Sequence, residues 1–367
     1  MKNRLFYLSI CILSFVFLFN SCGQQKSEWK GSIKYENGVT VVKNPKRPLY
    51  DEDVVGIKEV LSIGKTEGEE EYMFSQVRDI AVDDAGNIYV LDIKEANVKK
   101  FSKDGKYIKS IGKKGQGPGE IGMPAFITIS KQNEIVVEDP LSRRFAFFSF
   151  DGDFIKNLSF AKMSLVQIEC DKEGNIIGGT VDVEKQVYEV RKVSPEIDFI
   201  CSYGSSPFSR NPQIYNPFKP VLRWAVLSDD TVICGNAEEY VLEVYNPNGE
   251  IIKKILKDYD PVKITEEEIE EKKKEARPGR KLKIPTHHCP FYWFTVDDEG
   301  RIFVRTYKKA SDGNGYYYNI FDKDGKYIVD ILLMALPHVI KNNMIYTIEE
   351  DDDGYQYVKR YKVTWKY

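Results

Sequence analysis

Histidine is scarce in this chain, and its cysteines lack the spacing of metal or redox motifs. The only histidines among 367 residues are His287, His288 and His338. The cysteines past residue 22 are Cys170, Cys201, Cys234 and Cys289. No CxxC pair occurs among them, which excludes the common zinc and thiol-redox motifs. We therefore expect four buried thiols that pack as small hydrophobic groups.

The chain also lacks an excess of basic residues. It carries 53 Lys and Arg against 56 Asp and Glu, a formal net charge of −3. Removal of an N-terminal segment containing Lys2 and Arg4 would leave 51 basic residues and a net charge of −5. A mildly acidic chain offers no electrostatic footprint for DNA or RNA, so we expect no nucleic-acid partner.

Long apolar runs are confined to the N-terminus. Lys2 and Arg4 precede an almost unbroken apolar stretch over residues 5–19. This stretch is short for a bilayer span and is typical of an export signal. The following Ser21-Cys22-Gly23 resembles the cleavage site of bacterial lipoproteins, in which Cys22 would carry the lipid. An ordinary secretory signal and a membrane anchor are the alternatives.

Signatures of catalysis are absent as well. No GxSxG elbow occurs, and residues 112–120 (GKKGQGPGE) lack the GK[ST] ending and helical context of a phosphate-binding loop. His287 and His288 are adjacent, so on a strand they would point to opposite faces. The paired aspartates 83–84 and 297–298 fall in turns, where Asp is favoured for local hydrogen bonds. We predict no catalytic residue, no metal site and no cofactor.

A repeat dominates the rest of the chain. Residues 79–112 contain four short segments of alternating polarity, with an Asp104-Gly105 turn between the last two. Such a turn between alternating segments is a strong hairpin signal. Five further copies follow, at steps of 47, 41, 56, 70 and 43 residues counted from Val82. A four-stranded propeller blade takes about 40–50 residues, so each copy fits one blade.

Insertions explain the two long steps. They are the Pro- and Asn-rich stretch 207–220 and the charged stretch 265–283. In the second, Thr265 and Glu268 form a capping-box pattern, which predicts a helix to about residue 276.

The last copy contains only three strands, and a segment near the start of the chain can complete it. Residues 58–64 resemble an outer strand and end in Ser-Ile-Gly, as residues 110–112 do. We predict that residues 55–65 form the outer strand of blade six, because ring closure removes exposed sheet edges. The predicted fold is all-β, a six-bladed β-propeller of four-stranded antiparallel blades with one short helical insertion. A solenoid or a two-sheet sandwich is the alternative.

A family resemblance supports this prediction. Residues 86–120, GNIYVLDIKEANVKKFSKDGKYIKSIGKKGQGPGE, resemble the NHL-repeat, TolB-like group of six-bladed β-propellers, and its lipoproteins in particular. The resemblance implies a ring of blades around a central channel. It implies no single activity, because relatives include protein-binding modules, sensor domains, lactonases and lyases.

The domain prediction follows from these segments. Residues 1–21 are predicted to be a lipoprotein signal peptide, residues 22–54 a lipid-anchored tether and N-terminal segment, and residues 55–367 the propeller. The predicted location is the cell envelope, as an outer-membrane lipoprotein that faces the periplasm or the cell surface.

One face of such a ring collects the recognition-type residues. The segments that enter each inner strand and the loops between second and third strands open on the same face. Arginine and aromatic residues are common anchors for binding. The candidate binding residues on this face are Arg78, Arg143, Arg144, Arg223, Trp224, His288, Tyr292 and Trp293. We predict a monomeric, non-enzymatic binding module for a protein, peptide or glycan partner, with a channel enzyme of the lactonase or lyase kind as the alternative.

Overall fold

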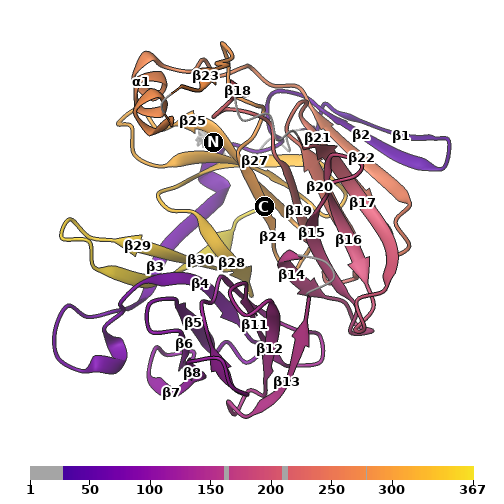
Figure 1. Cartoon of the computed structure of the whole chain (residues 1–367). Helices are drawn as coiled ribbons and strands as arrows, with labels where there is room; N and C mark the ends of the chain where they lie inside the picture. Colours follow the sequence, from indigo (N-terminus) through magenta and orange to yellow (C-terminus); the bar gives the residue numbers. More distant parts are fainter. Residues whose placement is uncertain (1–27, 161–164, 209–213, 278) are drawn as a thin grey trace, which may run out of the picture.

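The fold is a six-bladed β-propeller, as predicted (Figure 1). The computed structural model describes residues 28–160, 165–208, 214–277 and 279–367, so the predicted lipid site Cys22 lies outside the described residues. Six sheets each contain four antiparallel strands, and neighbouring sheets pack against one another. The innermost strand of the last blade contacts that of the first, which closes the ring.

The first three blades follow the repeat directly. Blade one contains β4 (Val77–Val82), β5 (Ile88–Asp92), β6 (Asn97–Phe101) and β7 (Tyr107–Ile111). Blade two contains β10 (Phe126–Ile129), β11 (Ile135–Asp139), β12 (Arg144–Phe148) and β13 (Phe154–Ser159). Blade three contains β14 (Val166–Cys170), β15 (Ile176–Asp182), β16 (Val187–Val193) and β17 (Phe199–Pro207).

Blades four to six follow, and blade six takes its outer strand from the N-terminal part of the chain. Blade four contains β19 (Leu222–Val226), β20 (Val232–Asn236), β21 (Val241–Tyr245) and β22 (Ile251–Lys257). Blade five contains β24 (Trp293–Val296), β25 (Ile302–Lys309), β26 (Tyr316–Phe321) and β27 (Tyr327–Leu333). Blade six contains β28 (Pro337–Lys341), β29 (Met344–Glu350), β30 (Gln356–Trp365) and β3 (Val55–Ile63). The antiparallel pairing of β3 with β30 confirms the predicted closure.

The N-terminal segment covers the outer edges of three consecutive blades. A hairpin of β1 (Ser32–Glu36) and β2 (Val39–Asn44) extends blade four, with β2 parallel to β22. The backbone N–H groups of Leu49 and Tyr50 then donate to carbonyls of β27 in blade five. A short 3-10 helix (Glu52–Val54) leads into β3 of blade six. Strand β3 was predicted from the sequence, whereas the hairpin was not.

The hairpin turns between third and fourth strands share one backbone geometry. Gly105, Gly152, Gly249 and Gly325 occupy this turn with φ between 77° and 90°. In blade three Ile197 takes the same position at φ 68°. A β-branched residue in the left-handed region is strained, and Ile197 retains it while packing into the core. This explains why the third repeat is hard to see in the sequence.

The insertions gather on the face where the inner strands begin. The helix α1 (Glu266–Glu275) starts with the predicted capping box of Thr265 and Glu268. Beside it the short strands β18 (Ile214–Tyr215) and β23 (Lys281–Leu282) pair in parallel, at the top of Figure 1. In blade two's entry segment, β8 (Lys113–Lys114) pairs with β9 (Glu120–Ile121). A second 3-10 helix (Glu70–Tyr72) precedes blade one. In the part of the chain that the structure describes, no helix is long and apolar enough to cross a membrane.

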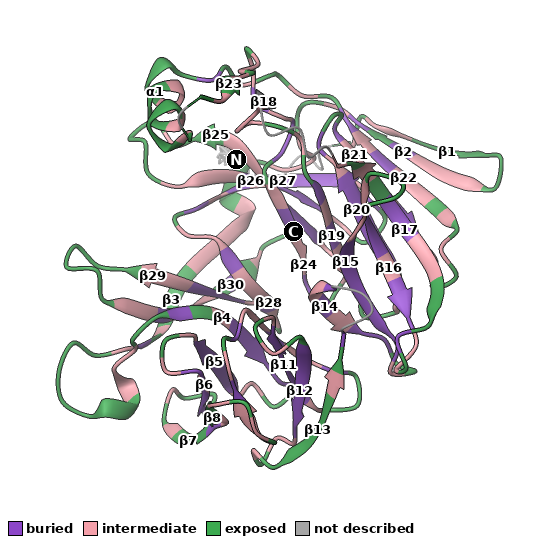
Figure 2. Cartoon of the chain, viewed as in Figure 1, coloured by how far each residue is buried: buried purple, intermediate pink, exposed green. Residues whose placement is uncertain are grey.

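Most buried residues lie on the strands (Figure 2), and their apolar side chains pack between neighbouring blades. Leu91 of blade one and Val137 of blade two, for example, belong to one cluster. Cys170 and Cys234 are buried, as predicted, whereas Cys201 and Cys289 are only half-buried; all four are free thiols.

Candidate functional site

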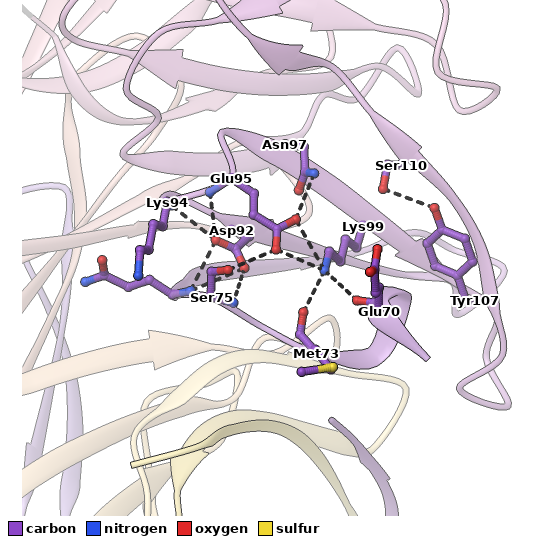
Figure 3. Close-up of polar contacts among 11 residues, drawn as sticks. Glu70, Met73, Ser75, Asp92, Lys94, Glu95, Asn97, Lys99, Tyr107 and Ser110 are labelled. Atoms are coloured by element: carbon purple, nitrogen blue, oxygen red, sulfur yellow. Dashed lines mark hydrogen bonds and ion pairs between the residues drawn. The ribbon is translucent and has the colours of Figure 1, made fainter. Parts of the chain in front are cut away.

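Buried charges hold the entry segment of blade one in place (Figure 3). The Asp92 carboxylate, at the end of β5, accepts the backbone N–H groups of Ser75 at 2.7 Å and Gln76 at 3.2 Å. The Lys99 ammonium on β6 donates to the Met73 carbonyl at 2.7 Å and the Glu70 carbonyl at 3.3 Å. An acid on the second strand and a base on the third thus fix the segment that enters the first.

Blade two repeats this arrangement. The contacts of Arg144 there correct its assignment as a binding residue. Asp139 accepts the backbone N–H groups of Gly122 and Met123 at 2.9 and 3.0 Å. The Arg144 guanidinium is buried beside Asp139 and donates to the carbonyls of Gln116 and Glu120 at 3.0 and 2.7 Å. Its donors face the chain itself, so Arg144 anchors the entry loop and is not available to a ligand.

Cationic and aromatic side chains meet at the junction of blades four and five. We call Arg223, Tyr292, Trp293, Arg305 and Tyr316 the Arg–Tyr cluster. The Arg223 guanidinium lies 4.6 Å from the Trp293 ring centroid and 5.6 Å from that of Tyr292. The Arg305 guanidinium lies 4.3 Å from Tyr292 and 3.8 Å from Tyr316. The exposed Tyr292 ring is therefore shared by two cations.

The two guanidiniums have no acidic partner among the described residues. Arg223 donates its Nε–H to the Tyr292 carbonyl at 3.2 Å, and the Arg305 side chain forms no hydrogen bond or ion pair within the described ranges. Burial lowers the pKa of the Arg223 guanidinium, which nevertheless remains a cation. Stacking occupies the faces of the guanidinium planes and leaves N–H groups at their edges for a carboxylate or phosphate.

His288 lies beneath this cluster and is tied to the helical insertion. Its buried ring stacks on Tyr307 with centroids 4.0 Å apart, and Tyr307 meets the edge of Tyr292 at 5.9 Å. The His288 Nε2 lies 3.2 Å from the Glu268 carboxylate of α1. Burial lowers the pKa of His288, so the ring is neutral at pH 7 and supports Tyr307 rather than presenting a charge.

The remaining candidates do not join the cluster. Trp224 is buried in the core between blades three and four, which corrects its assignment as a binding residue. Arg78 is exposed on blade one, with its guanidinium 5.7 Å from the Phe126 ring. Arg143 is exposed on blade two in a tight turn at φ 49°. These two arginines belong to blades opposite the cluster in the six-membered ring.

Three members of the Arg–Tyr cluster were predicted from the sequence, and two were not. Arg223, Tyr292 and Trp293 lie in entry segments or inner strands, where the prediction looked. Arg305 and Tyr316 lie on the second and third strands of blade five. The signal that could have found them is the position of Arg305 directly opposite Trp293 in the hairpin register.

Carboxyl groups on β4 (Asp79), β11 (Glu138) and β14 (Glu169), in blades one to three, contact neighbouring blades. Asp79 accepts the Ile127 backbone N–H and lies 3.2 Å from His338 Nδ1. Glu138 accepts the Gln167 backbone N–H at 3.1 Å, and Glu169 accepts a hydrogen bond from Thr128 at 2.9 Å. Asp79 thus links blades one, two and six, and Glu138 and Glu169 each link blades two and three.

Burial raises the pKa of both glutamates. It brings the pKa values of Glu138 and Glu169 to about 7, and the negative charge of Asp79 adds to the shift. Within the described ranges no group of three or more His, Cys, Asp or Glu side chains could hold a metal ion. An open depression of about 330 Å³ lies elsewhere, on blade six, between Glu59, Glu349 and Lys359.

Comparisons with known proteins agree with the fold. A family model described as a 6-bladed beta-propeller matches residues 59–188. No curated protein matches the sequence. A candidate exported protein from Bacteroides fragilis has a similar structure, with a TM-score of 0.58 and 12% identity over 88% of this chain and 99% of that one.

Two further solved structures are less similar. A member of the duf4221 family from Bacteroides vulgatus gives a TM-score of 0.50 and 10% identity over 86% of this chain and 99% of that one. A gluconolactonase from Xanthomonas campestris gives 0.46 and 12% identity over 78% and 86%. At such identities the likeness shows the fold alone. The NHL-repeat and lipoprotein assignments stay predictions.

Proposed function

We propose that this chain is a lipid-anchored binding module of the cell envelope that recognises an acidic group on a protein, peptide or glycan through the Arg–Tyr cluster. One observation carries the proposal. Two guanidiniums share the exposed Tyr292 ring, and neither forms an ion pair with a carboxylate among the described residues. The chain has more acidic than basic residues, so two cations without acidic partners form a local positive site that attracts an anion.

The chemistry of the cluster favours binding over catalysis. Arginine edges pair bidentately with carboxylates or phosphates, and an aromatic face adds apolar contact with a sugar or side chain. No nucleophile–base pair lies at the cluster, because His288 is buried and already engaged by Glu268. The ligand would therefore be bound and released without chemical conversion.

The proposed location rests on the N-terminus and on a structural neighbour. The apolar run and Cys22 match a lipoprotein signal. The Bacteroides fragilis neighbour is a candidate exported protein, which supports an extracytoplasmic location for this chain as well.

Calorimetric titration tests the proposed site. The probes are a galacturonic-acid oligosaccharide, a Glu-rich peptide and a neutral malto-oligosaccharide. We expect at least one acidic probe to bind the native chain and the double variant Arg223→Ala/Arg305→Ala to bind it about tenfold more weakly or worse, because two charge-assisted contacts are lost. Arg47→Ala removes an exposed charge outside the cluster and is the matched control. Equal binding by the double variant would place the site elsewhere.

A second candidate function is acid–base chemistry in the channel. It is favoured by the pKa values of about 7 at Glu138 and Glu169, which suit proton transfer near neutral pH. Each carboxyl also bridges two blades, which is a sufficient structural reason for its burial. We therefore rank this function below binding.

A further inference from the structure

The strand β1 leaves an open edge on blade four. It is the terminal strand of a six-stranded sheet with the order β1-β2-β22-β21-β20-β19. Four of its five residues are exposed, including Ile33 at 48% and Tyr35 at 76%. It contains no proline or bulge, two of the devices that keep an edge strand from pairing, and its two charged residues, Lys34 and Glu36, have opposite signs.

The hairpin register determines which backbone groups face outward. Glu36 pairs with Val39 across a two-residue turn in which Asn37 and Gly38 both have positive φ. Residues that flank such a turn exchange hydrogen bonds, and the pattern then alternates along the strand. Glu36 and Lys34 therefore bond to β2, whereas the N–H and C=O groups of Tyr35 point away from the sheet.

We propose that β1 pairs with β1 of a second copy, antiparallel and across a two-fold axis at Tyr35. In this register Tyr35 lies opposite its counterpart and the two exchange backbone hydrogen bonds. Lys34 of each copy then lies opposite Glu36 of the other, on the opposite face of the joined sheet. The two blades four become one continuous sheet of twelve strands.

Charge complementarity selects this register. Neither Lys34 nor Glu36 forms an ion pair within the described part of the chain, so both are available. A shift of the axis to Lys34 would place the two lysines against each other, and directly opposed like charges destabilise a strand pair. The Tyr35 register instead gives two cross-strand ion pairs and one aromatic pair. The same surface of both copies meets across the two-fold axis, as in most homodimers.

The interface is short, so the dimer is a weak one. Its strength depends on the two ion pairs, which salt screens at an exposed position. Since Lys34, Tyr35 and Glu36 lie outside the core, substitutions there leave the propeller intact. Self-association and folding can therefore be measured separately.

Sedimentation of the full chain in a non-ionic detergent at low salt tests the proposal. Over concentrations from about 1 μM to about 1 mM, we expect the native chain to shift reversibly from one copy to two. Lys34→Glu and Glu36→Lys each create two like-charge contacts and should weaken self-association about tenfold. An equimolar mixture of the two variants should associate again, because every opposed pair then has opposite charges. The double variant Lys34→Glu/Glu36→Lys should do the same on its own.

Equal melting temperatures for all variants serve as the folding control. A native chain that stays monomeric over the whole concentration range would overturn the proposal, because β1 would then not pair with a second copy. So would a mixture that associates no better than either single variant, since self-association would then use another surface.

Discussion

Asp92 and Asp139 end the second strands of adjacent blades, and each carboxylate accepts two backbone N–H groups from the segment that enters its own blade. A base on the third strand, Lys99 or Arg144, holds carbonyls of the same segment. In blades one and two, buried charges thus fix the segments that lead into the inner strands.

Loss of Arg144 should destabilise the fold without touching the proposed site. Arg144→Ala leaves Asp139 buried without its cationic neighbour and removes the donors that hold Gln116 and Glu120. Breaking a buried pair by removing one partner costs about 3–5 kcal/mol. Chemical denaturation measures this loss. Arg143→Ala, at the adjacent exposed arginine, is the control and should stay within about 0.5 kcal/mol of the native chain.

Glu138 should make stability fall as pH rises. The folded chain keeps the proton of Glu138 up to about pH 7, whereas the unfolded chain releases it near 4.5, the ordinary pKa of a glutamate. The contribution of Glu138 to the free energy of unfolding is therefore full below about pH 4.5. It declines between about pH 4.5 and about pH 7 and is absent above. The difference amounts to roughly 3 kcal/mol.

Glu138→Gln isolates this effect, because the amide cannot ionise and can still accept the Gln167 N–H. We expect the variant to be more stable than the native chain at pH 8 and equally stable at pH 4. Melting curves at both values decide the matter. A constant difference between the two chains at all pH values would contradict the assigned pKa.

Substitution of a turn glycine by alanine should destabilise the fold most where the new Cβ also lacks space. Gly249 has φ 87°, and a Cβ there would lie 2.8 Å from the Ser202 carbonyl oxygen. Gly354 has φ 82° with open space around it. Gly354→Ala should cost about 1–2 kcal/mol through backbone strain alone, and Gly249→Ala should cost clearly more. Equal losses in the free energy of unfolding, measured by urea denaturation, would mean that the Ser202 carbonyl moves aside without an energetic cost.

Membrane attachment depends in our account on Cys22. Cys22→Ser removes the thiol that would carry the lipid, so the chain should lose its mature processing or appear in the soluble fraction. Fractionation followed by immunoblotting measures this. Unchanged processing and membrane association in the variant would contradict the lipoprotein assignment.

The repeat was sufficient to predict the ring, because Asp-Gly turns and alternating strands recur at blade-length intervals. The capping box at Thr265 and the closing strand near Ile63 were equally local signals. The β1–β2 hairpin was missed although its Asn37-Gly38 turn is a local hairpin signal. Only its attachment to β22, about 200 residues away in the chain, has no local pattern that encodes it.

The site was harder to predict because a face assignment does not fix burial. Arg144 and Arg223 both carry a guanidinium to the predicted face, yet one is buried against carbonyls and the other is stacked on aromatic rings. Which of the two is available to a ligand depends on the segments that pack against it. The sequence does not show which segments these are.

Trp293 provides the most direct measurement of where the ligand sits. Its ring lies 4.6 Å from the Arg223 guanidinium, so an anion bound there should change its fluorescence. We expect titration with the acidic probe that binds best to give a saturable change in tryptophan emission. The change should disappear in Trp293→Phe, while calorimetry still detects binding. An emission change that persists in Trp293→Phe, or binding that survives Arg223→Ala/Arg305→Ala unchanged, would contradict recognition at the Arg–Tyr cluster.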